Sequence, residues 1–243
     1  MSQIEHVRQP HAALDIASRH GKARKIERLL RLPAQNVPLH LLEVGTGSGA
    51  IAHYFGTNSQ QIYRVEAVDV HDSRIVTEGF RYTQVEGTDL PFDAASFDVV
   101  LTNHVIEHVG DDAAQMAHLR EIRRVLKPEG IGYLAVPNRW MLVEPHFGLP
   151  LLSWLPRAWR TSYVRATGKG ECYDCEPLEM KQLERLFERA DLRYANTCIE
   201  ALRATFDIEH ANSLASSVLK QTPDWALRPF LPLIPTLIYR FWH

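Results

Sequence analysis

A turn with three glycines, set between two apolar runs, constrains this chain more than any other feature. Residues 41–51 read LLEVGTGSGAI, with Gly45, Gly47 and Gly49 at every second position. Glycine has no Cβ, so it adopts positive φ without steric cost and lets the backbone approach a ligand closely. The apolar run before the turn predicts a buried strand, and residues 50–55 predict the start of a helix. A strand, a glycine turn and a helix N-terminus together form the nucleotide-binding cradle of open α/β sheets.

The chain continues to alternate strand-like and helix-like segments after this turn. Residues 62–69, 82–86 and 97–103 read as strands, and the last is the nearly continuous apolar run expected of a strand covered on both faces. Residues 111–126 carry apolar side chains at three- and four-residue spacing and predict a helix, and residues 130–136 predict the next strand. This order indicates a doubly wound, mostly parallel sheet.

The flanking segments predict additions to that sheet. Residues 11–32 suit an amphipathic leader helix with a break at Gly21, and residues 177–190 suit a helix with Pro177 in its first turn. Between residues 138 and 170 lie three of the five tryptophans, which suggests an irregular, partly helical cap. We expect one domain, divided into N-terminal lid helices (1–36), a cofactor-binding core (37–138), a substrate cap (139–176) and a C-terminal part that completes the sheet (177–243).

Composition and charge narrow the classes of partner. The 27 Lys and Arg nearly balance the 29 Asp and Glu, and no long basic run occurs, so nucleic acid is not expected as a partner. Residues 1–10 contain no apolar signal segment, which favours a cytoplasmic protein. The three cysteines, Cys172, Cys175 and Cys198, cannot form a disulfide framework. Cys172 and Cys175 form a CxxC pair, but no second pair or histidine follows at ligand spacing, so an ordinary loop without metal is expected.

The glycine turn also matches a dinucleotide-binding pattern. Gly45, Gly47 and Ala50 fit its glycine and alanine positions, and Asp69 follows Gly49 by twenty residues, where a ribose-binding acid is expected. This pattern alone does not distinguish a nicotinamide cofactor from an adenosyl cofactor.

Further motifs distinguish an adenosyl cofactor from a nicotinamide cofactor. They are Glu43, two residues before the first glycine; the turn Asp89-Leu90-Pro91-Phe92; the run FDVVLTNHVIEHV at residues 97–109; and LKPEG at residues 126–130. With these motifs the chain resembles the class I S-adenosylmethionine-dependent methyltransferases, in particular the small-molecule, type 11-like branch. The resemblance covers residues 37–138 and the leader helix. It implies a Rossmann-like sheet of seven strands, the last one antiparallel, with an inserted cap.

The resemblance also implies roles for individual residues. The three glycines would line the methionine and ribose parts of S-adenosylmethionine, Asp69 would hold the ribose hydroxyls, and Asp89 would face the adenine amine with Leu90 against the ring. Glu43 would orient the loop or meet the cofactor's amino group. The full set of expected cofactor contacts is Glu43, Gly45, Thr46, Gly47, Gly49, Asp69, Val70, Asp89, Leu90, Asn103 and His104.

Candidate catalytic residues are histidines. Methyl transfer needs alignment and a dry cavity, and an oxygen acceptor benefits from a general base. His108 is the first candidate, followed by His104 and His146, although a histidine in this motif can also serve as a helix cap or packing residue. The cap would supply an acceptor pocket, or its aromatic residues would only pack against the sheet; the residues concerned are Trp140, Met141, His146, Phe147, Trp154, Trp159 and Tyr163.

The C-terminal run 225–242 is apolar, but Pro229, Pro232 and Pro235 interrupt it and argue against a spanning helix. The resembled fold predicts strands at 192–200 and 236–242 instead. Exposed apolar surface here leaves peripheral membrane contact and a homodimer open.

These observations favour an S-adenosylmethionine-dependent methyltransferase that acts on a small or lipid-like acceptor at oxygen. Two alternatives stay open at this stage. A non-catalytic S-adenosylmethionine-binding partner subunit would keep every glycine and acid. An NAD-dependent oxidoreductase would explain the glycines but gives no role to Asp89 or to the leader helix.

Overall fold

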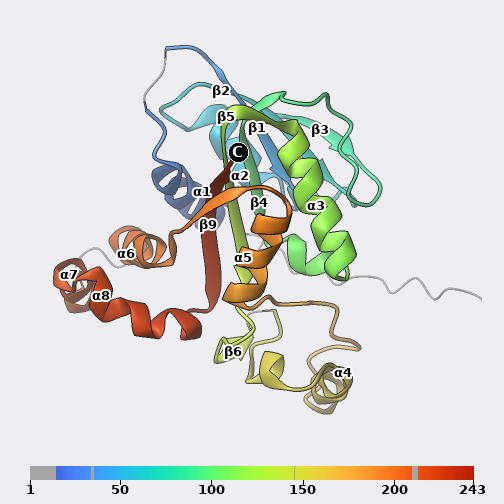
Figure 1. The fold of residues 1–243 in the computed structure, drawn as a ribbon, viewed down its shortest axis with the longest axis vertical. Coiled ribbons are helices and arrows are strands. Elements are labelled where there is room, and N and C mark those ends of the chain that lie inside the picture. The colour runs from blue at the N-terminus through green and yellow to red at the C-terminus, as the bar shows by residue number, and fades with distance from the viewer. Residues whose placement is uncertain (1–14, 34–35, 145, 210–212) are drawn as a thin grey trace, which may run out of the picture.

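The glycine turn joins the first strand to a helix in a seven-stranded sheet (Figure 1). The computed structural model describes residues 15–33, 36–144, 146–209 and 213–243. The strands run in the order β3-β2-β1-β4-β5-β9-β8, and β9 is antiparallel to both of its neighbours. This topology confirms the predicted doubly wound sheet with an antiparallel last strand. The strands are β1 (Leu39–Val44), β2 (Tyr63–Asp69), β3 (Arg81–Gln84), β4 (Phe97–Asn103), β5 (Leu126–Pro137), β8 (Arg193–Asn196) and β9 (Thr236–Trp242).

Helices cover both faces of the sheet. α1 packs against α2 and α6, and α3 packs against α5 in a separate layer (Figure 1). The Asp15 carboxylate caps α1 by accepting from the backbone N–H groups of Ala17 and Ser18, and Asp111 caps α3 in the same way. These elements are α1 (Ile16–Leu30), α2 (Ala50–Thr57), η1 (Ile106–His108), α3 (Asp112–Val125), α5 (Met180–Arg189), α6 (Cys198–Glu209), α7 (Leu214–Gln221), α8 (Asp224–Leu227) and η3 (Arg228–Leu233).

The central strand shows why the sheet needs two helical layers. In β4 the side chains of Val99, Val100 and Leu101 are fully buried although they alternate between the two faces. A strand that is apolar on both sides is stable only when each face is covered, because exposed apolar surface costs about 25 cal/mol per Å². The nearly continuous apolar run at 97–103 therefore predicted both the strand and its central place.

Several predicted boundaries are wrong. Gly21 lies inside a continuous α1, because an isolated glycine weakens a helix without ending it when the flanking turns pack. The strand expected at 192–200 is limited to β8, and α6 begins at Cys198. β5 begins at Leu126, four residues earlier than predicted, and α5 begins at Met180, after Pro177. Residues 11–14 of the expected leader helix lie outside the described residues.

The predicted cap is a small unit between β5 and α5. It contains a two-stranded ribbon and two short helices around its own cluster of buried side chains, Phe147, Leu149, Leu152 and Val164. Trp154 fixes the unit by donating its indole N–H to the Met141 carbonyl oxygen at 2.8 Å. The elements are β6 (Val143–Glu144), β7 (Leu149–Pro150), η2 (Leu152–Trp154) and α4 (Arg157–Ala166).

The apolar C-terminal run forms α8, η3 and β9. Within the described part of the chain, none of the helices has the length and apolar character needed to cross a membrane. Exposed apolar side chains do gather on α7, α8 and η3, among them Leu214, Val218, Trp225 and Phe230. Peripheral membrane contact and a homodimer stay predictions.

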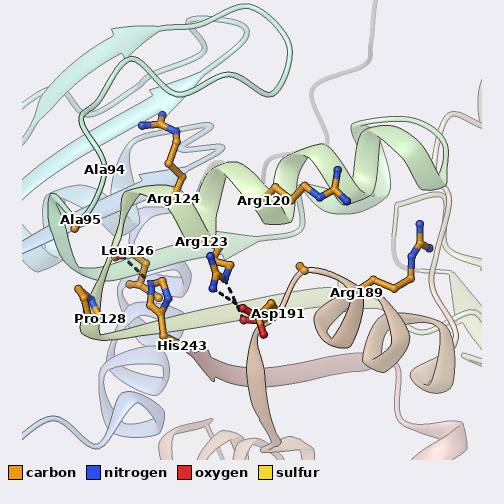
Figure 2. A pocket seen from close by; sticks show the side chains of 11 residues that line it. Ala94, Ala95, Arg120, Arg123, Arg124, Leu126, Pro128, Arg189, Asp191 and His243 are labelled. Carbon is orange, nitrogen blue, oxygen red and sulfur yellow. Dashed lines mark hydrogen bonds and ion pairs between the residues drawn. The ribbon is translucent and has the colours of Figure 1, made fainter.

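A pocket of about 510 Å³ lies where the parallel strands begin, and its lining includes three arginines of α3 together with Arg189, Asp191 and His243 (Figure 2). The glycine turn lies at the opposite edge, where β1 ends. Ligands of open α/β sheets bind at the carboxyl edge of the strands, so the glycine turn lies at the edge expected for a ligand site.

Candidate functional site

The three glycines of the turn all have left-handed backbone conformations, as the sequence predicted. Their φ angles are +77°, +54° and +79° for Gly45, Gly47 and Gly49. A Cβ on Gly49 would lie 2.3 Å from the Val76 carbonyl oxygen, and one on Gly45 would lie 2.3 Å from Val105 Cγ2. Both the torsion angles and the close approaches therefore require glycine.

The Glu43 side chain forms hydrogen bonds that hold the glycine turn in place. Its Oε2 accepts a hydrogen bond from Thr46 Oγ1 at 2.7 Å and one from the Ala52 N–H, in the first turn of α2, at 3.0 Å. The side chain is buried, and burial raises the pKa of Glu43 to about 8. Of the two roles that the sequence left open for Glu43, the structure supports orientation of the loop. The Thr46 hydroxyl is turned toward this acid as well.

Asp69 ends β2 and meets the same turn. Its Oδ2 accepts from the Gly47 N–H at 2.8 Å, and its Oδ1 accepts from the His71 N–H at 3.3 Å. The next residue, Val70, is held through its carbonyl oxygen by Gln84 Nε2 of β3 at 3.0 Å. The half-exposed Asp69 carboxylate is thus hydrogen-bonded directly to the backbone of the glycine turn.

The turn at Asp89 and Leu90 depends on two residues that the sequence interpretation missed. Leu90 is buried, whereas Asp89 is exposed. The Leu90 N–H donates to Glu121 Oε2 at 3.0 Å, and Arg124 Nη2 donates to the Leu90 carbonyl oxygen at 2.9 Å. Glu121 and Arg124 also pair with each other at 2.8 Å, so α3 holds this turn in place.

The leader helix approaches the turn from the other side. The ring of His20 stacks on that of His53 in α2, with centroids 5.6 Å apart. Burial lowers the pKa of Arg19, and the nearby Glu43 carboxyl opposes that shift. α1 therefore lies beside the glycine turn, in the position expected of a lid.

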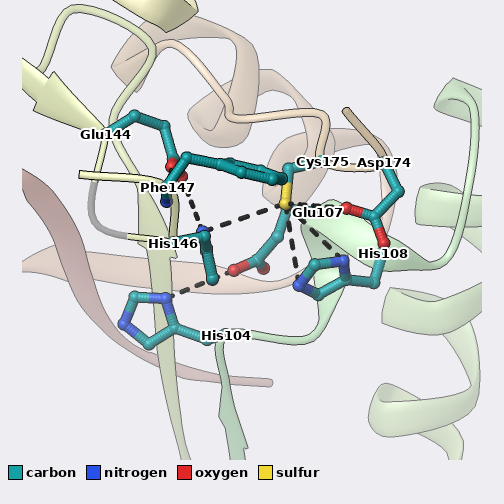
Figure 3. Close-up of polar contacts among 8 residues, drawn as sticks. All are labelled: His104, Glu107, His108, Glu144, His146, Phe147, Asp174 and Cys175. Carbon is teal, nitrogen blue, oxygen red and sulfur yellow. Dashed lines mark hydrogen bonds and ion pairs between the residues drawn. The ribbon is translucent and has the colours of Figure 1, made fainter. Parts of the chain in front are cut away.

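The three candidate histidines meet at one place, next to the end of β4 (Figure 3). His104 follows β4 directly, with φ of +60° and its Nδ1 3.2 Å from Glu107 Oε1. His108 lies on η1, and His146 comes from the cap with its Nδ1 2.6 Å from Glu144 Oε1. The His146 ring centroid lies 5.7 Å from that of His108 and 6.4 Å from that of His104. Left-handed non-glycine residues are costly by about 1 kcal/mol or more and often occur at functional sites.

Two buried carboxylates and one thiol complete this group, and none of them was predicted. The side chains of Glu107 and Glu144 have no exposed surface. Cys175, in the segment before α5, places its Sγ 3.9 Å from His108 Nδ1 and 3.8 Å from His146 Nδ1. Burial raises the pKa of the Cys175 thiol. Burial by itself would lower the pKa of His146, but the hydrogen bond to Glu144 and the charge of that carboxylate act in the other direction, and the pKa of His146 lies above its ordinary value. No spacing signal could have found them, because they come from separate segments.

The aromatic residues of the cap divide into packing and exposed groups. Phe147 is part of the cap's own buried cluster, and Met141 is fully buried. Trp140 and Trp154 pack edge to face with ring centroids 5.3 Å apart, whereas Trp159 is exposed. Of the seven cap residues named from the sequence, only His146 belongs to the histidine group.

Comparison with known proteins agrees with this geometry. A methyltransferase domain model matches residues 42–134. A Mycobacterium tuberculosis protein named a probable S-adenosylmethionine-dependent methyltransferase is 33% identical over 114 residues, covering 45% of this chain and 39% of that protein. A Caulobacter vibrioides ubiquinone biosynthesis O-methyltransferase is 31% identical over 132 residues, covering 49% of this chain and 50% of that protein. The matched part thus spans about two fifths to one half of these relatives.

The fold has solved counterparts at low sequence identity. A chain of the Haloferax volcanii complex between the Trm112 methyltransferase activator and a methyltransferase superposes with a TM-score of 0.55 and 18% identity, covering 93% of this chain and 90% of that one. At this identity the likeness establishes the fold alone. The matched residues contain the glycine turn, Asp69, the Asp89 turn and the histidines that follow β4, so this part of the chain is similar to the methyltransferase domain and to probable S-adenosylmethionine-dependent methyltransferases.

Proposed function

We propose that this chain binds S-adenosylmethionine and transfers its methyl group to a hydroxyl oxygen of a small or lipid-like acceptor. The observation that carries the proposal is the hydrogen bond at 2.8 Å between the Gly47 N–H and Asp69 Oδ2. It joins the glycine turn to an acid at the carboxyl edge of the sheet, where a nucleoside can be held by backbone and carboxylate together. When bound, S-adenosylmethionine supplies an activated methyl group.

The residues at the turn suit an adenosyl cofactor. Asp69 has two oxygens and can accept hydrogen bonds from both hydroxyls of a ribose. Leu90 offers a buried apolar surface for the adenine ring beside Asp89. Because the Thr46 hydroxyl is engaged by Glu43, Thr46 would contact the cofactor through its backbone. Val70 and Asn103 lie at the ends of β2 and β4, on the same edge.

His104 is the residue we assign as general base. With its Nδ1 beside Glu107 Oε1, the imidazole would keep that proton toward the carboxylate and use Nε2 to accept a proton from the acceptor hydroxyl. His108 and His146 flank this position and would shape the acceptor site.

Two observations support the nature of the acceptor. Exposed apolar side chains lie on the cap, among them Leu142, Val143, Leu151 and Trp159. Such a surface suits an acceptor with an apolar part. An oxygen acceptor agrees with the name of the Caulobacter relative.

Calorimetric titration with S-adenosylhomocysteine tests cofactor binding. We expect saturable binding of this ligand by the native chain and none of NADH. Asp69→Ala should weaken binding by about 100-fold or more, because two charge-assisted hydrogen bonds are lost at roughly 1.5 kcal/mol or more each. Asp72→Ala is the matched control, since Asp72 is an exposed acid three residues away that pairs with Arg74. NADH binding without the adenosyl ligand would favour an oxidoreductase and contradict the proposal.

Turnover separates an enzyme from a non-catalytic subunit. Radiolabelled methyl from S-adenosylmethionine is expected to enter a metabolite in an extract of the source organism. His104→Ala should slow that transfer by about 100-fold while S-adenosylhomocysteine still binds nearly as in the native chain. Tight cofactor binding with no transfer to any metabolite would instead support a binding subunit.

A further inference from the structure

Three side chains of metal-binding type converge although they come from segments far apart in the chain. His108 lies on η1, His146 lies in the cap, and Cys175 lies before α5 (Figure 3). One ligand atom from each lies within 4.8 Å of the ligand atoms of the other two. Along the chain, Cys175 is separated from His108 by 67 positions and from His146 by 29. The fold alone therefore creates this group.

The spacing of these atoms is close to that of a tetrahedral zinc site. Cys175 Sγ lies 3.9 Å from His108 Nδ1 and 3.8 Å from His146 Nδ1. With Zn–S of about 2.3 Å and Zn–N of about 2.0–2.1 Å, a tetrahedral ion places sulfur and nitrogen about 3.6 Å apart. A contraction of a few tenths of an ångström would bring the Cys175 thiolate and His108 Nδ1 to coordinating distance, and His146 would coordinate through Nε2 because Glu144 holds its Nδ1.

A buried carboxylate already orients one of the histidines. Glu144 Oε1 lies 2.6 Å from His146 Nδ1, and Glu144 Oε2 accepts from the Phe147 N–H at 2.8 Å. A carboxylate that holds one ring nitrogen of a histidine leaves the other nitrogen to bind a metal, which is the usual arrangement around protein-bound zinc. The Glu144 side chain is fully buried, so this orientation is fixed by the cap.

A second buried carboxylate, that of Glu107, indicates a place for a cation. Neither oxygen of Glu107 accepts a hydrogen bond among the described residues, although His104 Nδ1 lies 3.2 Å from Oε1, and the side chain has no exposed surface. Glu107, His104 and His146 form a second group of potential ligands that shares His146 with the first. Burying an ionised carboxylate without hydrogen bonds is costly, and a divalent cation beside it would offset that cost.

We propose that His108, His146 and Cys175 bind a divalent zinc-type ion, with the Glu107 carboxylate at the remaining position. One thiolate and one carboxylate among the four ligands balance the two charges of the ion. Binding would release the Cys175 thiol proton to solvent. The ion would lie beside His104, at the edge of the proposed acceptor site. The proposal concerns metal binding and does not require that methyl transfer occurs.

Zinc titration of the full chain tests this proposal. Protein freed of metal with a chelator and of any affinity tag is titrated with zinc chloride, and bound metal is counted by mass spectrometry after desalting. We expect one ion per chain. Cobalt substitution should add a sulfur-to-cobalt charge-transfer absorption band, because only a thiolate ligand produces it.

Cys172→Ser is the matched control, since Cys172 is the other cysteine of the CxxC pair and is absent from both groups of potential ligands. Cys175→Ser should abolish the cobalt band and lower zinc affinity by more than about tenfold, whereas Cys172→Ser should change neither. Glu144→Gln should lower zinc affinity by roughly 10- to 100-fold and keep the cobalt band. If Cys175→Ser does not fold, His146→Gln takes its place and should lose the bound ion.

Absence of stoichiometric zinc in the native chain, or equal zinc affinity in Cys175→Ser and Cys172→Ser, would overturn the proposal. Binding of S-adenosylhomocysteine is measured on the same samples. A chain that binds this ligand but no zinc contradicts only the metal site, and one that binds zinc but not the ligand contradicts only the proposed function.

Discussion

The amino and carboxyl edges of the sheet differ in the burial and the pairing of their charged side chains. At the amino edge, the pocket of Figure 2 is lined by arginines that face carboxylates: Arg123 Nη2 lies 2.6 Å from Asp191 Oδ2, and Arg189 Nη1 lies 2.9 Å from Asp112 Oδ2. These groups are largely exposed, and such pairs add little to stability. Arg123 and Arg189 of this pocket are therefore already paired with carboxylates.

At the carboxyl edge, three acids are buried, and one of them, Glu107, accepts no hydrogen bond among the described residues. Glu43 is 2% exposed, and the side chains of Glu107 and Glu144 are fully buried. Buried charge without full compensation persists only where the surrounding fold imposes it, which is typical of functional sites. The contrast teaches that pocket volume is a weaker guide to the site than unbalanced buried charge.

The largest expected effect comes from a substitution in the glycine turn at the carboxyl edge. Gly49→Ala forces a Cβ to within 2.3 Å of the Val76 carbonyl oxygen at φ +79°. We expect a loss of about 3 kcal/mol or more, a melting temperature lower by roughly 2–4 °C per kcal/mol, and no measurable S-adenosylhomocysteine binding.

Gly168→Ala is the matched control for this variant. Gly168 has a similar φ of +68°, but nothing lies within 4 Å of its added Cβ. It should cost only the torsional penalty of about 1 kcal/mol and leave cofactor binding intact. Equal melting temperatures for the two variants would show that the contact with Val76 is unimportant.

A second prediction tests whether the buried acid beneath the turn carries a pH-dependent cost. Burial raises the pKa of Glu43 from 4.5 to about 8, so the folded state binds a proton more tightly than the unfolded chain does. The contribution of Glu43 to stability is then fully present below about pH 4.5 and is lost as pH rises toward about 8.

Glu43→Gln isolates this contribution. Glutamine can still accept hydrogen bonds from Thr46 and Ala52 but does not titrate. The difference in free energy of unfolding between native and variant chains, measured by urea unfolding from pH 4.5 to 8, should move in favour of the variant as pH rises. A difference that stays constant over this range would contradict the shifted pKa.

The carboxyl edge also shows which parts of the site a sequence can reveal. The turn glycines and Asp69 were predictable because both roles are local: a backbone that needs positive φ, and an acid at the end of a strand. The sheet followed from apolar periodicity, since β4 is apolar on both faces. The helix break predicted at Gly21 was wrong because packing of α1 overrides the weak helix propensity of one glycine.

The remainder of the site depends on contacts between distant segments. Cys175 had no histidine at ligand spacing along the chain, yet the fold brings His108 and His146 to within 4 Å of its sulfur. Glu107 precedes a histidine in a short motif, and nothing in that motif indicates that its oxygens are buried without hydrogen bonds. Glu121 and Arg124 resemble an ordinary surface pair three residues apart on a helix, and only the folded chain brings them to Leu90.

The smallest expected effect comes from two adjacent arginines that both line the amino-edge pocket. Arg124 donates to the carbonyl oxygens of Leu90 and Phe92, whereas Arg123 pairs with the exposed Asp191. Arg124→Ala should weaken S-adenosylhomocysteine binding by roughly 5- to 10-fold, because the Leu90 turn loses two hydrogen bonds of about 1 kcal/mol each and relaxes before the ligand binds. Arg123→Ala should leave binding unchanged and cost less than about 1 kcal/mol of stability. Calorimetry on both variants measures the difference, and similar losses would mean that the amino-edge pocket as a whole, rather than the hydrogen bonds to Leu90 and Phe92, influences the cofactor site.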